Sequence, residues 1–251
     1  MWLLFVAACA HHPPAAPHPP ARYTVTAILG SPEHFLTSTY SVLVERGPGG
    51  ATVFRTVESK VTVEDGANTF AWDSASPDPR EPWVVSQERA VAGVPATVIL
   101  DGAGRPVEVL DLPAWQTRAR AALLLLGLPP QAHASGEALL DGPGLIRGLA
   151  RDFPGSPTEP GPWKRTEWIG DRLLHRSETC VSAGPERWTC DGVAEGVGFK
   201  EGTSQTLVTW DAHGLLELDA RWDAIAVAAG PSGEVAERAV AGRRRVVREA
   251  R

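Results

Sequence analysis

Two cysteines lie at a spacing that permits a disulfide. Cys180 and Cys190 flank a Gly184-Pro185 turn in the segment ETCVSAGPERWTCDG. A hairpin centred on this turn places the cysteines opposite each other on neighbouring antiparallel strands. We therefore predict a cross-strand disulfide, which stabilises the fold by roughly 3 kcal/mol on the chain-entropy model. A zinc site or a redox pair is the competing chemistry, but no second cysteine pair exists and His175 and His213 are isolated.

The third cysteine, Cys9, follows a short apolar run at the start of the chain. The run from Trp2 to Ala8 is too short to cross a bilayer, because a transmembrane helix needs about 20 apolar residues. A secretory signal needs an apolar region of only about 7 residues, followed by small residues at the cleavage site. The alternative is an apolar stretch that arose by chance.

The residues Val6-Ala7-Ala8-Cys9 resemble the lipobox of bacterial lipoproteins, in which an apolar residue and two small residues precede the cysteine. The resemblance implies that the thiol of Cys9 is alkylated by diacylglycerol and that residues 1–8 are removed as a signal peptide. It also implies that the new amino terminus is acylated, for example with palmitate. We therefore expect a protein anchored by lipid in the bacterial cell envelope, at the outer membrane.

Residues 9–21 follow as a Pro/His-rich tether, with the sequence HHPPAAPHPPA after Cys9. Such a sequence favours an extended, polyproline-like chain that does not pack into a core. It suits a spacer that lifts a domain off a membrane. Metal binding by His11, His12 and His18 is the alternative, but no fourth ligand lies nearby, so we predict neither a metal nor another cofactor.

Composition limits the class of protein and of partner. The chain has 251 residues and 43% hydrophobic content, enough for a packed core in one large domain or two small ones. The net charge of -6 gives no reason to expect nucleic-acid binding, which needs a basic surface. The basic run Arg243, Arg244, Arg245, Arg248 and Arg251 is expected on a solvated last strand, with a membrane-leaflet or nucleic-acid contact as the alternative.

Strand patterns dominate two regions, residues 22–111 and 158–251. In the first, β-branched residues alternate on both sides of the Gly47–Gly50 turn, and a second strand pair surrounds Asp101 and Gly104, which fit a type I turn. The same Asp-x-x-Gly spacing recurs at Asp211 and Gly214. The recurrence suggests an internal duplication. The last hairpin divides at Gly230–Gly233, and its second arm, EVAERAVAGRRRVV, is expected as a strand, with a helix as the alternative.

Residues 112–157 have helical spacing instead. One helix is expected from Leu112 to about Leu128, with Pro113 in its first turn, and an interrupted second helix covers GEALLDGPGLIRGLARDFPG. Both are expected to pack on the concave face of a sheet. The proline-rich junction FPGSPTEPGPWKRTEWIG then leads into the second region. This junction resembles that of uncharacterised exported β-rich lipoproteins with duplicated halves.

The predicted fold is therefore α+β and β-rich, with two similar antiparallel halves, half-barrel or sandwich-like, joined by a helical connector. No nucleophile elbow, P-loop, dinucleotide fingerprint or metalloprotease motif is present, so we predict no catalytic residues. Nine tryptophans either fill a core or line an apolar groove. The expected function is non-catalytic binding of an apolar ligand or an envelope partner protein. The alternative is an envelope hydrolase whose active site has no recognisable motif.

Overall fold

The protein is described here from a computed structural model that covers residues 20–31, 34–76, 78, 80–157, 159–169, 172–211, 214–229 and 235–250. For residues 131, 133, 134, 167–169, 201, 228 and 229 the description is limited to the backbone. The predicted signal peptide, Cys9, nearly all of the tether and the Gly230–Gly233 turn lie outside the described residues. Within them, no helix is long and apolar enough to cross a membrane.

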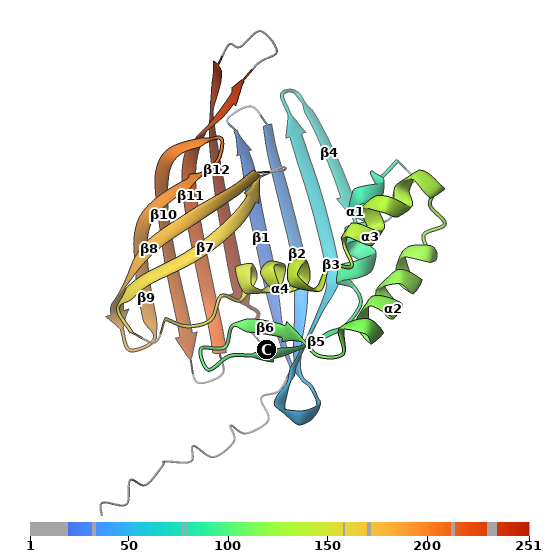
Figure 1. Cartoon of the computed structure of the whole chain (residues 1–251), viewed down its shortest axis with the longest axis horizontal. Helices are drawn as coiled ribbons and strands as arrows, with labels where there is room; N and C mark the ends of the chain where they lie inside the picture. Colours follow the sequence, from blue (N-terminus) through green and yellow to red (C-terminus); the bar gives the residue numbers. More distant parts are fainter. Residues whose placement is uncertain are drawn as a thin grey trace, which may run out of the picture.

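All the described strands belong to one antiparallel sheet (Figure 1). Its order is β6-β5-β3-β2-β1-β12-β11-β10-β9-β8-β7, with β4 paired to β3 outside this path. The strands are β1 (Ala21–Ser31), β2 (His34–Arg46), β3 (Thr52–Asp65), β4 (Asn68–Asp73), β5 (Ala96–Leu100), β6 (Pro106–Val109), β7 (Gly161–Ile169), β8 (Arg172–Gly184), β9 (Arg187–Gly196), β10 (Phe199–Asp211), β11 (Gly214–Ala229) and β12 (Val235–Arg248).

The two predicted halves are joined through β1 and β12, which pair along most of β1. Within each half, strands that follow one another in the chain are mostly neighbours in the sheet. The sheet curves around one concave face and stays open between β6 and β7 (Figure 1). The β-rich fold with antiparallel halves and a helical connector is thus confirmed. Of the two arrangements expected, it has the half-barrel.

The connector contains three helices, α2 (Leu112–Leu124), α3 (His133–Ala138) and α4 (Gly142–Asp152), with the short 3-10 helix η2 (Pro130–Ala132). Helix α2 starts where Pro113 predicts, and the Asp111 carboxylate caps its N-terminus by accepting from the Ala114 amide. It ends earlier than predicted, because Gly127 turns left-handed at φ 61°. Helix α4 begins in the same way, with the Asp141 carboxylate as its cap.

Some elements match the sequence-based expectations and others depart from them. Helix α1 (Trp83–Ala92) was not expected, and the 3-10 turn η1 (Pro48–Gly50) fills the predicted β2–β3 turn. Strand β7 begins at Gly161, inside the segment expected as a proline-rich junction. The second arm of the last hairpin is a strand, β12, as predicted, but the expectation of a solvated strand is wrong for Arg244, which is 9% exposed. That side chain points to the concave face, where Asp152 pairs with it.

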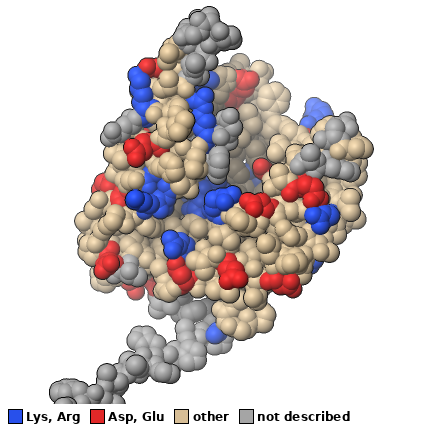
Figure 2. All heavy atoms as spheres, viewed as in Figure 1, with Lys and Arg blue, Asp and Glu red and all other residues tan. Residues whose placement is uncertain are grey.

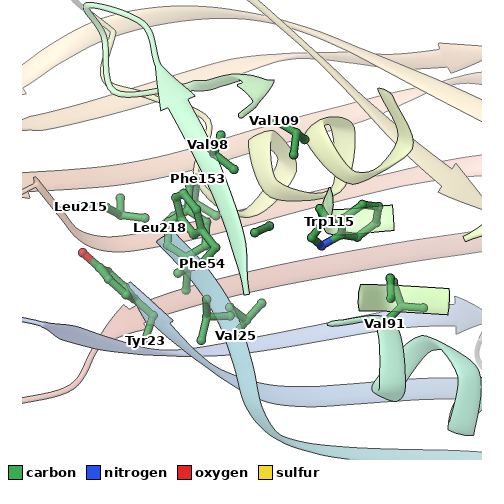
Figure 3. Close-up of a cluster of buried hydrophobic side chains, with 14 of the residues drawn as sticks. Tyr23, Val25, Phe54, Val91, Val98, Val109, Trp115, Phe153, Leu215 and Leu218 are labelled. Carbon is green, nitrogen blue, oxygen red and sulfur yellow. The ribbon is translucent and has the colours of Figure 1, made fainter. Parts of the chain in front are cut away.

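Helix α4 lies over the lower part of the concave face and contacts both β6 and β7, the two strands that flank the opening (Figure 1). Just after it, Phe153 packs edge-to-face on Tyr23 of β1, with ring centroids 5.2 Å apart. The ring of Phe54 in β3 also packs on the Phe153 ring, with centroids 5.1 Å apart. Trp115 of α2 belongs to the same buried cluster (Figure 3). The main core therefore fills the lower end of the half-barrel.

The two Asp-x-x-Gly turns both join neighbouring antiparallel strands. The Asp101 carbonyl accepts from the Gly104 amide at 2.9 Å, and Gly104 has a φ of 82°, which favours glycine. The second turn joins β10 to β11, and its two middle residues lie outside the described part of the chain. The internal duplication that these turns suggest stays a prediction.

Candidate ligand-binding face

Side-chain alternation assigns each strand residue to the concave or the outer face. Val25 of β1 lies opposite Val246 of β12, which lies opposite Leu218 of β11, and all three are fully buried against the helices. Every second residue from these positions therefore points to the concave face. On this basis the concave face divides into three bands: a core band, a polar band and an apolar band.

The core band is the packed lower part, which α4, β5 and β6 cover. Its side chains belong to the main buried cluster and leave no surface for a ligand. The band comprises Tyr23, Val25, Val42, Phe54, Val208, Leu218 and Val246.

The polar band crosses the second-half strands above the core band. Arg176 of β8 is 1% exposed, and its guanidinium donates to the Glu178 carboxylate at 2.6 Å and to the Ser204 hydroxyl at 2.7 Å. Arg165 of β7 donates to the other oxygen of the same carboxylate at 2.8 Å. Thr206 of β10 completes this set, accepting from Arg176 at 2.9 Å. The charged groups are thus held by a dense set of hydrogen bonds.

A second part of the polar band ties α4 to the sheet. The Asp152 carboxylate at the end of α4 accepts from the Arg244 guanidinium of β12 at 2.8 Å and from the Tyr40 hydroxyl of β2. Arg151 lies 3.6 Å from the same carboxylate. This group connects three elements that are far apart in the sequence. These contacts fix the position of the end of α4 on the concave face.

The charges of the polar band shift the pKa values of its members. Burial opposes ionisation of Glu178, but the positive charges of Arg165 and Arg176 outweigh burial, so its pKa lies below the usual value. Burial raises the pKa of Tyr40, and the Asp152 charge raises it further. Glu178 is therefore ionised and Tyr40 neutral at physiological pH.

The apolar band continues the concave face towards the end where β1 passes to β2, which we call the open end. Leu29 of β1 lies opposite Leu36 of β2, which lies opposite Val63 of β3, and Val63 lies opposite Phe70 of β4. On the other side of β12, a small cluster of buried apolar residues extends the band. The full band comprises Leu29, Leu36, Val61, Val63, Phe70, Trp72, Leu174, Ala194, Trp222, Ala224 and Val240.

Part of the apolar band is open to solvent. Leu36 is 41% exposed and Phe70 is 50% exposed, and the Phe70 ring stacks on that of Trp72. Figure 2 shows this face hollowed between the second-half strands and the helices, with Lys and Arg side chains along its lower side. Trp222 lies flat on β12, since a Cβ atom at Gly242 would come within 2.4 Å of its ring. A glycine at this position therefore allows the indole to line the sheet.

A second apolar recess lies near the open end but on the outer face. Its volume is about 590 Å³, and its floor consists of small residues of β1 and β12, namely Gly30, Ala239 and Ala241. Phe35 of β2 and Ile225 of β11 form its walls. Because Phe35 follows the alternation opposite to Leu36, this groove opens on the other face of the sheet from Leu36. Ala224 and Val240 of the apolar band also border it.

The predicted cysteine pair forms a disulfide between β8 and β9. Cys180 and Cys190 are cross-strand partners, and their exposed fractions are 1% and 0%. The bond therefore strengthens the wall of the half-barrel. Cys9 lies outside the described residues, and the described residues contain no group of three His, Cys, Asp or Glu side chains that could hold a metal ion.

Some tryptophans fill the core and others line an apolar surface, the two roles that the sequence predicts as alternatives. Trp115 is 1% exposed and fills the main core, whereas Trp222 and Trp72 belong to the apolar band. Trp83, at the start of α1, is 44% exposed and belongs to neither. No local pattern in the sequence singles out Leu29 or Leu36. The sequence signal for Phe70 and Trp72 is their spacing, because aromatic residues two apart share one face of a strand.

Comparison with known proteins finds no protein family that matches the chain. No curated protein matches it either. Among solved structures, the chain is similar to one of lipovitellin that concerns lipid-protein interactions, with a TM-score of 0.50 and 11% sequence identity. The match covers 94% of this chain and 25% of the lipovitellin chain, so the protein spans about a quarter of that chain's length. At this identity the likeness shows the fold alone.

Proposed function

We propose that this protein is a lipid-anchored envelope protein that binds the hydrocarbon chain of a lipid on the apolar band, without catalysing a reaction. One observation carries the proposal: the concave face is filled by the core band at one end, yet stays apolar and partly open at the other. Leu36 and Phe70 are large apolar side chains that face the hollow of the half-barrel while 41% and 50% exposed. A bound chain would remove this surface from water, at about 25 cal/mol per Å².

The polar band sets the depth of the site. Arg176 and Glu178 are already buried and bonded to each other, and a hydrocarbon chain that entered between them would break these hydrogen bonds, which costs free energy. The ligand chain is therefore expected to stop at Trp222 and Ala194, which adjoin Ser204 and Arg176 across the strands. The open part of the site is a shallow surface over β2 and β4, and it ends at the buried cluster of Leu174, Ala194, Trp222 and Ala224.

Three further points support the proposal. The lipovitellin structure of similar fold concerns lipid-protein interactions. The lipobox resemblance at Cys9 fits a protein that works beside a membrane. The buried disulfide fits an oxidising compartment, in which such bonds persist.

A fluorescence binding titration tests the proposal. Delipidated protein is titrated with a fluorescent 16-carbon fatty acid, and the Leu36→Asp variant is compared with Leu216→Asp. Leu216 lies at the opposite end of the sheet and is 39% exposed, so it matches Leu36 in type and exposure. We expect Leu36→Asp to weaken binding by about tenfold or more, since a charge replaces an apolar contact.

The outcome that contradicts the proposal is equally clear. If the wild type binds no fatty acid, lysolipid or phospholipid, the apolar band is not a lipid site. If a partner protein in a purified complex then protects Leu36 and Phe70 from solvent, the apolar band is a protein-binding surface instead of a lipid site.

A further inference from the structure

Large exposed apolar side chains lie at the open end of the sheet, next to the apolar band or, for Val235, on the outer face of β12. Because the strands are antiparallel, the strand ends that flank the β1–β2, β3–β4, β9–β10 and β11–β12 connections all lie at this end. Each of these four connections, or a strand beside it, carries at least one large exposed apolar residue, and Ile225 of the outer groove is a further one at this end. We call this set the rim, and it comprises Leu36, Phe70, Val197 and Val235.

Two of the rim residues are among the most exposed apolar side chains of the described chain. Val197 is 92% exposed between Gly196 and Gly198, and Val235, at the start of β12, is 63% exposed. Isolated exposed apolar residues are common on protein surfaces. Comparable side chains, such as Val107, Val181 and Leu216, also lie at the opposite end of the sheet, but there the core band fills the concave face, so only the rim adjoins an open apolar surface.

The rim is continuous with the proposed binding site. Leu36 and Phe70 belong to both, and Phe199, two residues after Val197, packs on the apolar cluster that contains Trp222. A hydrocarbon chain that leaves the apolar band through the open end therefore contacts rim side chains before it contacts water. Transfer by this route avoids exposing the chain, which costs roughly 0.8 kcal/mol for each CH₂ group.

We propose that the rim docks on the surface of a lipid bilayer and that the ligand passes between the apolar band and the bilayer during this contact. The proposal rests on the proposed function, since it needs a bound lipid chain. It is separate from the predicted anchor, because β1 begins at the opposite end of the sheet and lipid on Cys9 would not itself bring the rim to a membrane.

The kinetics of ligand transfer to vesicles test the proposal. The full chain with Cys9→Ser, which carries no lipid, is loaded with a fluorescent 16-carbon fatty acid. It is then mixed with vesicles of phosphatidylcholine and phosphatidylglycerol that contain a quencher. Transfer by contact predicts a rate that rises in proportion to vesicle concentration. Transfer through water predicts a rate that does not change with it.

Matched variants locate the contact. Val197→Asp alters the rim, whereas Val181→Asp alters a valine 53% exposed near the opposite end of β8. Leu125→Asp, at an 88% exposed position at the end of α2, tests the other strongly exposed apolar site. We expect Val197→Asp to slow transfer by roughly tenfold while fatty-acid affinity stays unchanged, and the other two variants to transfer at the wild-type rate.

Each of the remaining results overturns the proposal. A rate that does not change with vesicle concentration, or a Val197→Asp variant as fast as Val181→Asp, would show that the rim does not dock. Fatty-acid binding would persist in that case, so the proposed function would stand. Absence of fatty-acid binding in the wild type would instead remove both proposals.

Discussion

Leu29 of β1 and Leu36 of β2 lie opposite each other on the concave face of the sheet. Leu29 packs on the cluster that contains Trp222 and Leu174, whereas Leu36 is 41% exposed. The pair thus connects a packed apolar cluster of the second half with an open apolar surface of the first. This continuity across β1 and β12 makes the apolar band one surface.

Adjacent residues of β2 separate the two apolar recesses. Leu36 points to the apolar band and Phe35 lines the groove on the outer face. We expect Leu36→Asp to weaken fatty-acid binding by about tenfold and Phe35→Asp to leave it unchanged, since only the first places a charge in the proposed site. Fluorescence titration of both variants, with circular dichroism to confirm folding, measures the difference. The reverse order would move the site to the outer groove.

The polar band contributes to stability in a way that a single substitution detects. Glu178→Gln removes the carboxylate that Arg165 and Arg176 share, and breaking a buried ion pair costs about 3–5 kcal/mol. Glu217→Gln is the control, because its pair with Arg245 is exposed and such pairs contribute about 0–1 kcal/mol. Urea unfolding measures both free energies. Equal values for the two variants would show that the polar band does not stabilise the fold.

The lowered pKa of Glu178 predicts the pH dependence of this contribution. In the unfolded chain the group titrates near 4.5, and in the folded protein it titrates lower. The stabilisation is therefore fully present above pH 4.5 and is lost as the pH falls through the folded pKa. Urea unfolding of the wild type and of Glu178→Gln should differ most near neutral pH and converge in acid. A constant difference down to the lowest accessible pH would contradict the assignment.

The disulfide is expected in the exported protein. Thiol alkylation followed by mass spectrometry under non-reducing conditions should find Cys180 and Cys190 blocked, because both are buried and bonded. Replacing both by Ala should lower the free energy of unfolding by roughly 3 kcal/mol, since the unfolded chain gains entropy. Free thiols at both positions in exported protein would contradict the bond.

Lipid attachment at Cys9 stays a prediction with its own test. Cys9→Ala should abolish incorporation of labelled palmitate and release the protein from membranes in high salt, because the sulfur that carries diacylglycerol is gone. Several acyl chains are needed for stable anchoring, since one chain alone binds only marginally. If the unaltered chain takes up no label and washes off membranes, the lipobox resemblance at Val6–Cys9 is coincidental.

Local signals in the sequence predicted the elements that depend on few neighbouring residues. Gly184-Pro185 gave the β8–β9 hairpin and its disulfide, and Pro113 gave the start of α2. Helix α1 was missed because the Pro-rich stretch before it and the β-branched Val84-Val85 disfavour a helix. Its position is determined by packing instead, since Val91 belongs to the main core.

The candidate site depends on contacts that no local pattern contains. The pairing of β1 with β12 joins residues more than two hundred positions apart, such as Val25 and Val246, and creates the continuous concave face. The buried charges contradict the expectation that inward positions of a strand are apolar. The local signal for these buried charges is the pair Arg176 and Glu178, which have opposite charges and lie two residues apart on one face of β8.

The most direct test of lipid binding on the apolar band is photo-crosslinking with a fatty acid that carries a diazirine near its methyl end. After irradiation of the delipidated full chain with this probe, peptide mass spectrometry identifies the labelled residues. The proposed site predicts labels on Leu36, Phe70 and Trp222, which excess unlabelled palmitate removes. Labels confined to Phe35 and Ile225 of the outer groove, or labels that palmitate does not displace, would contradict it.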